Sequence, residues 1–138
     1  MVYSICTPTT TIVGQSPGGD LVWLGLKQGL HYNTVVDISL FFSTYNERYK
    51  STMKYSLQNT AAALLKMDMA GAHSAKNDSI AAVSLYNLWI GSNENQKKDM
   101  LRTLETTQHP PSVTKAHNHM IDGVCMTHKP KLCWCKEK

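Results

Sequence analysis

The pattern of apolar and polar positions predicts a strand, a short helix and a second strand in the first part of the chain. Residues 9–13 are apolar and β-branched and are followed by the turn residues Pro17-Gly18-Gly19, which predicts a short buried strand. Apolar residues after Asp20 predict a short helix, and the glycines behind them limit its length. Residues 34–38 are again β-branched and predict the second strand. Two strands that flank a helix indicate an α/β layer.

Three helices are predicted after this unit. Residues 43–54 are polar and basic and are expected to form an exposed loop. Ser56 can cap a helix whose apolar residues recur at helical spacing, and a longer helix is predicted from Ala75 to Ile90. A further amphipathic helix is expected within residues 92–107, before Pro110-Pro111. The apolar side chains expected to face a core are Trp23, Ile80, Val83, Leu85, Tyr86, Leu88 and Trp89.

Length and composition change this picture little. The chain has 138 residues, of which 42% are hydrophobic and 17% charged, so it should fold as one domain over residues 1–108 with a tail over residues 109–138. Its net charge of +4 permits a nucleic-acid partner. No apolar stretch approaches the roughly 20 residues of a membrane helix. With cysteines clustered near the end rather than spread as a disulfide framework, the protein is expected to be soluble and intracellular, cytoplasmic or nuclear.

A histidine and a carboxylate form the first candidate for chemistry. Gly71-Ala72-His73 is followed after four residues by Asp78, which lies inside the predicted long helix. A histidine at the start of a helix and a carboxylate one turn inside it can face one cleft. Such a pair suits a general base that deprotonates water beside a ligand of a divalent cation. Alternatively, both are ordinary surface or helix-capping groups.

The order of short motifs around this pair resembles a known family. The segments that carry the resemblance are Thr11-Ile12-Val13-Gly14-Gln15-Ser16 with Asp20-Leu21, then Val35-Val36-Asp37-Ile38-Ser39, then Ser56-Leu57-Gln58, and finally Gly71-Ala72-His73 with Asp78-Ser79. This order over residues 10–90 is similar to the second half of the DEDDh superfamily of 3′-to-5′ exonucleases, the group of ribonuclease T and oligoribonuclease.

The resemblance implies a fold, an activity and a set of residues. It implies an α/β fold of the ribonuclease H-like kind and the removal of nucleotides from a 3′ end, with RNA as the expected substrate. Asp20 matches the second acidic motif, His73 the general base and Asp78 the last acidic ligand. In the family, two divalent cations, Mg²⁺ or Mn²⁺, activate the attacking water and stabilise the leaving oxygen. Asp37 matches a generally structural aspartate, and we interpret it as a cap for the segment that follows.

One element of the family pattern is missing. The family begins with a strand that carries Asp-x-Glu, whereas residues 1–9 contain no acidic residue. Asp20 and Asp78 cannot hold two hard cations with about six oxygen ligands each unless other groups complete the shell. The resemblance therefore implies a fold truncated at its N-terminal strands, with a partner, a dimer mate or the tail covering the incomplete sheet. Catalysis requires the missing motif from elsewhere; the alternative is an inactive, nuclease-derived scaffold that binds RNA or protein.

A group of basic and aromatic residues is a further candidate for binding. Arg48, Lys50 and Lys54, with Tyr45 and Tyr49 among them, could follow a nucleic-acid backbone or form a solvated loop.

The tail contains thiol and imidazole side chains at close spacing. Cys125, His128, Cys133 and Cys135 are the ligand types that Zn²⁺ prefers, so a structural zinc site is a possible role for them. The alternatives are reduced cysteines or disulfides formed on oxidation, although Cys133 and Cys135 are too close to pair without strain. A zinc-stabilised interaction module is accordingly a third class of function, and it depends on the tail alone.

Overall fold

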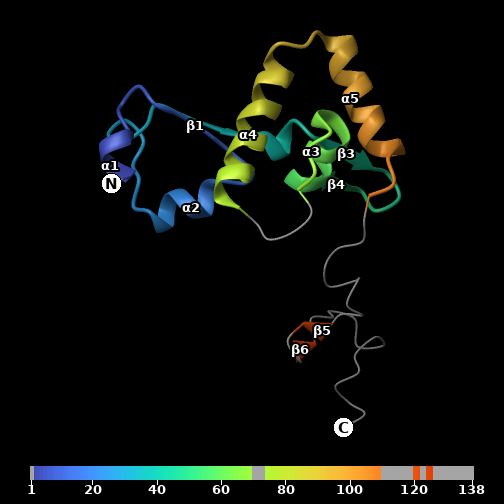
Figure 1. Cartoon of the computed structure of the whole chain (residues 1–138), viewed down its shortest axis with the longest axis horizontal. Coiled ribbons are helices and arrows are strands. Elements are labelled where there is room, and N and C mark those ends of the chain that lie inside the picture. Colours follow the sequence, from blue (N-terminus) through green and yellow to red (C-terminus); the bar gives the residue numbers. More distant parts are fainter. Residues whose placement is uncertain (1, 70–73, 110–119, 122–123, 126–138) are drawn as a thin grey trace. The chain divides into compact units, whose positions relative to one another are not determined.

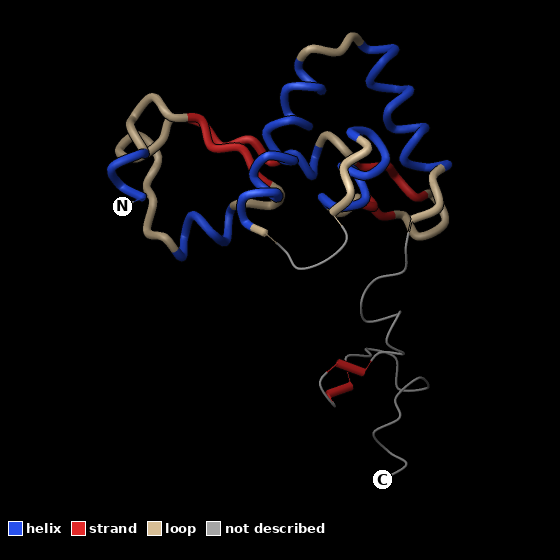
Figure 2. The backbone as a smooth tube through the Cα atoms, viewed as in Figure 1, coloured by secondary structure: helices blue, strands red, loops and turns tan. Residues whose placement is uncertain are grey.

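A computed structural model describes residues 2–69, 74–109, 120–121 and 124–125 (Figure 1 and Figure 2). By its contacts the chain divides into two compact units, residues 1–107 and residues 108–138. Helices and small sheets alternate along the first unit, so the expected α/β class is confirmed.

The first unit begins with a strand, helix and strand arrangement, after a short helix α1 (Val2–Ile5). Strand β1 (Thr11–Gly14) pairs in parallel with strand β2 (Thr34–Asp37), so that Gly14 lies opposite Asp37. Helix α2 (Gly18–Trp23) connects them, and Gly25 follows it with a φ of 66°, a conformation that favours glycine. The predicted strands and the helix between them are confirmed.

Residues 43–54 form a β-hairpin, and the prediction of a loop was wrong. After a short 3-10 helix η1 (Ile38–Leu40), strand β3 (Ser43–Asn46) pairs antiparallel with strand β4 (Ser51–Lys54). Polar residues do not prevent pairing, because the backbone supplies the hydrogen bonds of a sheet. Serine, threonine and tyrosine also suit a strand that remains largely in solvent, and all four residues of β4 are exposed.

The predicted helices are present with closely similar bounds. Helix α3 (Leu57–Leu65) begins after Ser56, whose side chain accepts a hydrogen bond from the Asn59 backbone N–H at 3.2 Å, so the predicted cap is confirmed. Helix α4 (Ala75–Ile90) has the predicted bounds. Helix α5 (Glu94–Thr106) begins with a capping box, in which Asn93 and Gln96 each accept a hydrogen bond from the other's backbone N–H at 2.9 Å.

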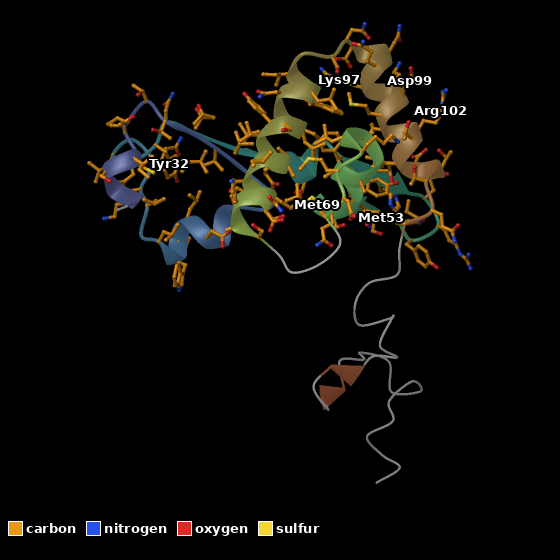
Figure 3. The ribbon with its side chains drawn as sticks, viewed as in Figure 1. Tyr32, Met53, Met69, Lys97, Asp99 and Arg102 are labelled. Atoms are coloured by element: carbon orange, nitrogen blue, oxygen red, sulfur yellow. The ribbon has the colours of Figure 1, made fainter. Side chains whose placement is uncertain are left out.

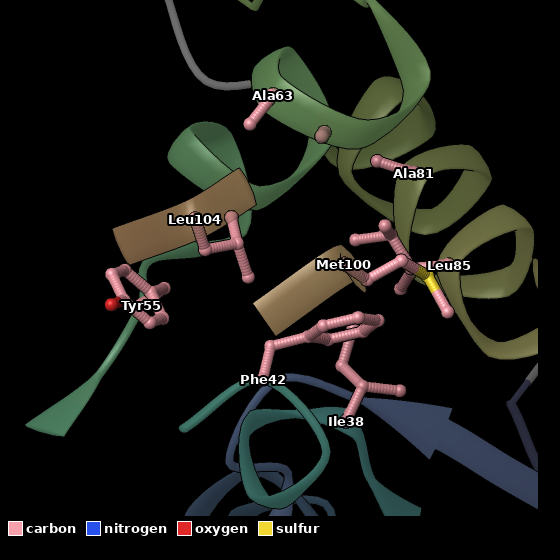
Figure 4. Close-up of a cluster of buried hydrophobic side chains, with 10 residues drawn as sticks. Ile38, Phe42, Tyr55, Ala63, Ala81, Leu85, Met100 and Leu104 are labelled. Carbon is pink, nitrogen blue, oxygen red and sulfur yellow. The ribbon is translucent and has the colours of Figure 1, made fainter. Parts of the chain in front are cut away.

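The core lies where helices α3, α4 and α5 meet the segment that follows β2. Figure 4 shows Leu85 of α4 and Leu104 of α5 pointing toward Phe42 and Ile38. Trp89 adds an aromatic cluster at the edge of this core: it stacks on Phe41 with ring centroids 5.3 Å apart and meets Phe42 edge-on at 5.2 Å. Helix α4 also contacts β1, so the same helix joins the core to the parallel strands.

Three of the predicted core residues are exposed instead. Trp23 of α2 is 85% exposed, and Ile80 and Val83 of α4 are 47% and 48% exposed. Helix α4 buries Ala81, Ala82 and Leu85, so its core face is displaced around the helix toward small residues. Alanines allow the backbones of two helices to approach closely but contribute little to an apolar pattern, which explains the error.

The second unit contains a short antiparallel pair. Strand β5 (Met120–Ile121) pairs with strand β6 (Val124–Cys125), and Met120 lies opposite Cys125. In the described part of the chain, no helix combines the length and apolar character needed to cross a membrane.

Candidate functional site

The carboxyl ends of the two parallel strands are joined by Asp37. Its Oδ1 accepts hydrogen bonds at 2.9 Å from the backbone N–H of Ser16, which follows β1, and from that of Ser39 in η1. Ser16 has a φ of 52°, a left-handed conformation that a non-glycine residue adopts only when its surroundings hold it there. Asp37 thus caps η1, as the sequence indicated, and also fixes the turn that leads from β1 to α2.

The pKa of Asp37 is lowered from its ordinary value. Partial burial acts to raise the pKa of this carboxyl, but hydrogen bonds from the Ser39 side chain and from the Ser16 and Ser39 backbone lower it, as does the charge of Lys54. Together these favourable interactions exceed the desolvation effect. The local hydrogen bonds therefore stabilise the charged form of Asp37, which agrees with a structural role.

The two acidic candidates lie in the first turns of two different helices. Asp20 is exposed in the first turn of α2, a helix of six residues that follows the end of β1. Asp78 is partly buried in the first turn of α4, and its backbone N–H donates to the Ser74 carbonyl oxygen at 2.9 Å. Because α4 contacts β1 and α2 follows β1, both aspartates belong to elements attached to the same strand. His73 lies outside the described residues.

The basic candidates lie on the β3–β4 hairpin. Arg48 and Lys50 belong to its turn and Lys54 to β4, and all three side chains are exposed. The guanidinium of Arg48 lies over the ring of Tyr49, 5.5 Å from its centroid. The Asn46 side chain accepts a hydrogen bond from the Tyr49 backbone N–H at 3.2 Å, which holds the turn.

Two cations of helix α5 are engaged in local pairs. Lys97 and Arg102 of α5 (Figure 3) lie 2.9 Å from Glu94 and 3.8 Å from Asp99, each one turn away on the same helix. Lys97 also lies over the Trp89 ring at 5.4 Å. These residues support α5 and its contact with α4 rather than forming a basic surface.

The sequence did not reveal a link between the hairpin and the parallel strands. Gln15, the residue after β1, donates from Nε2 to the Tyr55 carbonyl oxygen at 3.0 Å. Tyr55 follows β4 and is buried, so this hydrogen bond fixes the base of the hairpin to the carboxyl end of β1. The glutamine could be recognised in the sequence only as part of the Val-Gly-Gln motif, which does not identify its partner.

The metal-ligand candidates are only partly described. Among residues 2–69 and 74–109, no group of three or more histidine, cysteine, aspartate or glutamate side chains forms a site that could hold a metal ion. Of the four tail candidates for zinc, Cys125 belongs to β6, and His128, Cys133 and Cys135 lie outside the described residues.

Comparisons with other proteins give no family for this chain. No family model matches it, and neither the curated proteins nor the solved structures contain a significant match. The functional inference below depends on the order of motifs in the sequence and on the arrangement of the described residues.

Proposed function

We propose that this chain is a 3′-to-5′ exonuclease-like protein of ribonuclease H-like fold that acts on or binds RNA. The observation that supports it best is the arrangement around β1. This strand pairs in parallel with β2, leads into the helix that carries Asp20 and contacts the helix that carries Asp78. Strand β1, the helix with Asp20 and the helix with Asp78 follow one another along the chain in the order of the DEDDh pattern.

In this proposal, Asp20 and Asp78 bind Mg²⁺ or Mn²⁺, and His73 is the general base. The cations would supply Lewis-acid stabilisation and a more acidic bound water. Two carboxylates provide too few oxygen ligands for two such ions. Residues 1–10 contain no carboxylate, so hydrolysis needs acidic groups from another segment or another chain. In this proposal, Asp20 and Asp78 would hold one side of the metal site and His73 would accept the proton.

The second candidate function is RNA binding without hydrolysis. The β3–β4 hairpin favours it, because three exposed cations and two exposed tyrosines occur together on one hairpin. Basic and aromatic side chains together are what proteins use to bind unpaired nucleic acid. This function requires no complete metal site.

A nuclease assay separates the two functions. The purified full chain is incubated with 3′-labelled single-stranded RNA and Mn²⁺, and the products are separated by length. Stepwise shortening that Asp78→Asn abolishes is the result expected of the exonuclease. Asp99→Asn is the matched control, because Asp99 is an exposed helical aspartate on α5. Since first-turn aspartates stabilise helices, circular dichroism must show that the Asp78→Asn variant is folded.

Two outcomes contradict hydrolysis by this site. Shortening that survives Asp78→Asn would assign the activity to another site or to a contaminant. If the wild-type chain binds RNA but leaves its length unchanged with Mn²⁺ present, this chain does not hydrolyse RNA by itself, and the binding function is the one that holds for it.

A further inference from the structure

The pairing of the β3–β4 hairpin determines which of its side chains share a face. Ser43 lies opposite Lys54, and Tyr45 lies opposite Thr52. Side chains alternate between the two faces of a strand, so these four residues share one face. Tyr55, the next residue after Lys54, belongs to the other face, where it is buried and its hydroxyl lies 3.4 Å from that of Thr44.

Tyr45 and Lys54 are therefore neighbours on the outward face. They occupy diagonal positions, two pairs apart in the register and on the same face. Tyr45 is 63% exposed, whereas tyrosines are on average of intermediate burial. The opposite face meets the core only at the base of the hairpin, through Tyr55, while Met53 on that face is 46% exposed.

The turn adds positive charge to one end of this face. Arg48 and Lys50 are exposed there, with Glu47 as the acidic residue among them. Arg48 covers one side of the Tyr49 ring, whereas Tyr45 has no such contact with a described cation. Of the two tyrosines, Tyr45 is thus better placed to offer its ring to a ligand.

The other end of this face reaches the carboxyl ends of the parallel strands. The hydrogen bond from Gln15 to the Tyr55 backbone fixes it there, and Lys54 is close enough to Asp37 for its charge to act on that carboxylate. In α/β sheets, ligands bind at the carboxyl ends of the strands, and this is the end of β1 from which the chain continues to Asp20.

We propose that the outward face of the β3–β4 hairpin is a platform for an unpaired RNA strand, on which a base stacks against Tyr45 and neighbouring phosphates contact Lys54, Arg48 and Lys50. The positive charges of the hairpin are complementary to a phosphate backbone, and the exposed Tyr45 ring can stack on a base only if the flat face of that base is accessible. A duplex offers its phosphates but not its base faces, so it lacks the second contact. The proposal rests on the proposed RNA function and names the form of RNA that the protein selects.

The test is a binding measurement without hydrolysis. Fluorescence anisotropy of a labelled single strand of about 12 nucleotides is recorded with the full chain in EDTA, and the same strand annealed to its complement is measured beside it. The single strand is expected to bind more tightly than the duplex. Tyr45→Ala is expected to weaken single-strand binding by about 10-fold, while Tyr45→Phe, which keeps the aromatic ring, stays within about 2-fold of the wild type.

Charge variants complete the test. Lys54→Gln is expected to weaken binding, whereas Lys98→Gln, which removes an exposed charge from α5, leaves it unchanged. Equal binding of single strand and duplex, or unchanged binding by Tyr45→Ala, overturns the platform while leaving RNA binding intact. No binding by the wild-type chain contradicts the proposed RNA function itself. Because Tyr45 and Lys54 are exposed, their replacement should not disturb the fold, which circular dichroism verifies.

Discussion

At the scale of single residues, Asp37 contributes to stability by joining segments that are distant in sequence. Its carboxylate accepts backbone hydrogen bonds from Ser16 and Ser39, and hydrogen bonds to a charged acceptor are stronger than neutral ones. Asp37→Ala is expected to lower the free energy of unfolding by about 2 kcal/mol, because the backbone N–H groups of buried Ser39 and exposed Ser16 lose their charged acceptor. Chemical denaturation measures the change. Asp99→Ala should stay within about 0.5 kcal/mol of the wild type, and an equal loss in both variants would contradict the assigned role.

The lowered pKa of Asp37 gives its contribution a definite pH dependence. A carboxyl whose pKa is lower in the folded state stabilises that state fully above its unfolded pKa, near 3.9, and loses the effect as the pH falls through the folded pKa. The difference in unfolding free energy between the wild type and Asp37→Asn should therefore be constant from about pH 5 to pH 7 and shrink below about pH 4. Urea titrations at several pH values test this. A difference that persists unchanged at low pH would show that the charge of Asp37 is unimportant.

At the scale of elements, α5 is held to the domain mainly by its apolar face. Leu104 is fully buried beneath α3, in the cluster that includes Met100 and Leu85. Leu104→Ala is expected to lower the free energy of unfolding by about 2–5 kcal/mol, because it removes buried apolar surface and leaves a cavity. Thermal and chemical denaturation measure the effect. Glu105→Ala is the control on the exposed side of the same helix and should be nearly neutral; similar losses in both variants would contradict this packing.

The elements that sequence could predict are those whose signals are local. The bounds of α4 and the cap of α3 follow from periodicity and from Ser56, which act within a few residues. The β3–β4 hairpin escaped prediction because its strands are polar and their pairing is visible only in the register. The exposure of Ile80 was also not predicted, since whether the isoleucine face or the alanine face of α4 is buried depends on what packs against this helix.

The candidate site was predictable to a similar extent. Motif order led to the prediction of Asp20 and Asp78 as site residues; in the structure, α2 follows β1 and α4 contacts it. The connection from Gln15 to the hairpin could not be inferred, because it joins residues far apart in the chain through a backbone carbonyl that no sequence pattern marks. Local chemistry can thus be read from a sequence, whereas the surface it forms depends on tertiary contacts.

At the scale of the whole molecule, the parallel sheet and α2 offer a surface for association. In the described part of the chain this sheet has two strands. The consecutive side chains Val22 and Trp23 of α2 are 82% and 85% exposed. Open strand edges and exposed apolar groups favour a covering partner. We expect the chain to self-associate. Sedimentation velocity should then show an apparent mass that increases with concentration, and Trp23→Ser should weaken this increase. A chain that stays monomeric at all concentrations would exclude a second copy as that partner.

The salt dependence of RNA binding measures how many of the chain's charges reach the phosphates. The net charge of +4 acts on any polyanion at long range, but ions are released only where cations contact phosphates directly. For single strands each contact contributes about 0.7 to the slope of log K against log salt, so three hairpin cations predict a slope of about −2. Lys54→Gln should reduce its magnitude by about 0.7, while Lys98→Gln leaves it unchanged. If both variants change the slope equally, binding reflects net charge, and the hairpin is not the surface on which RNA lies.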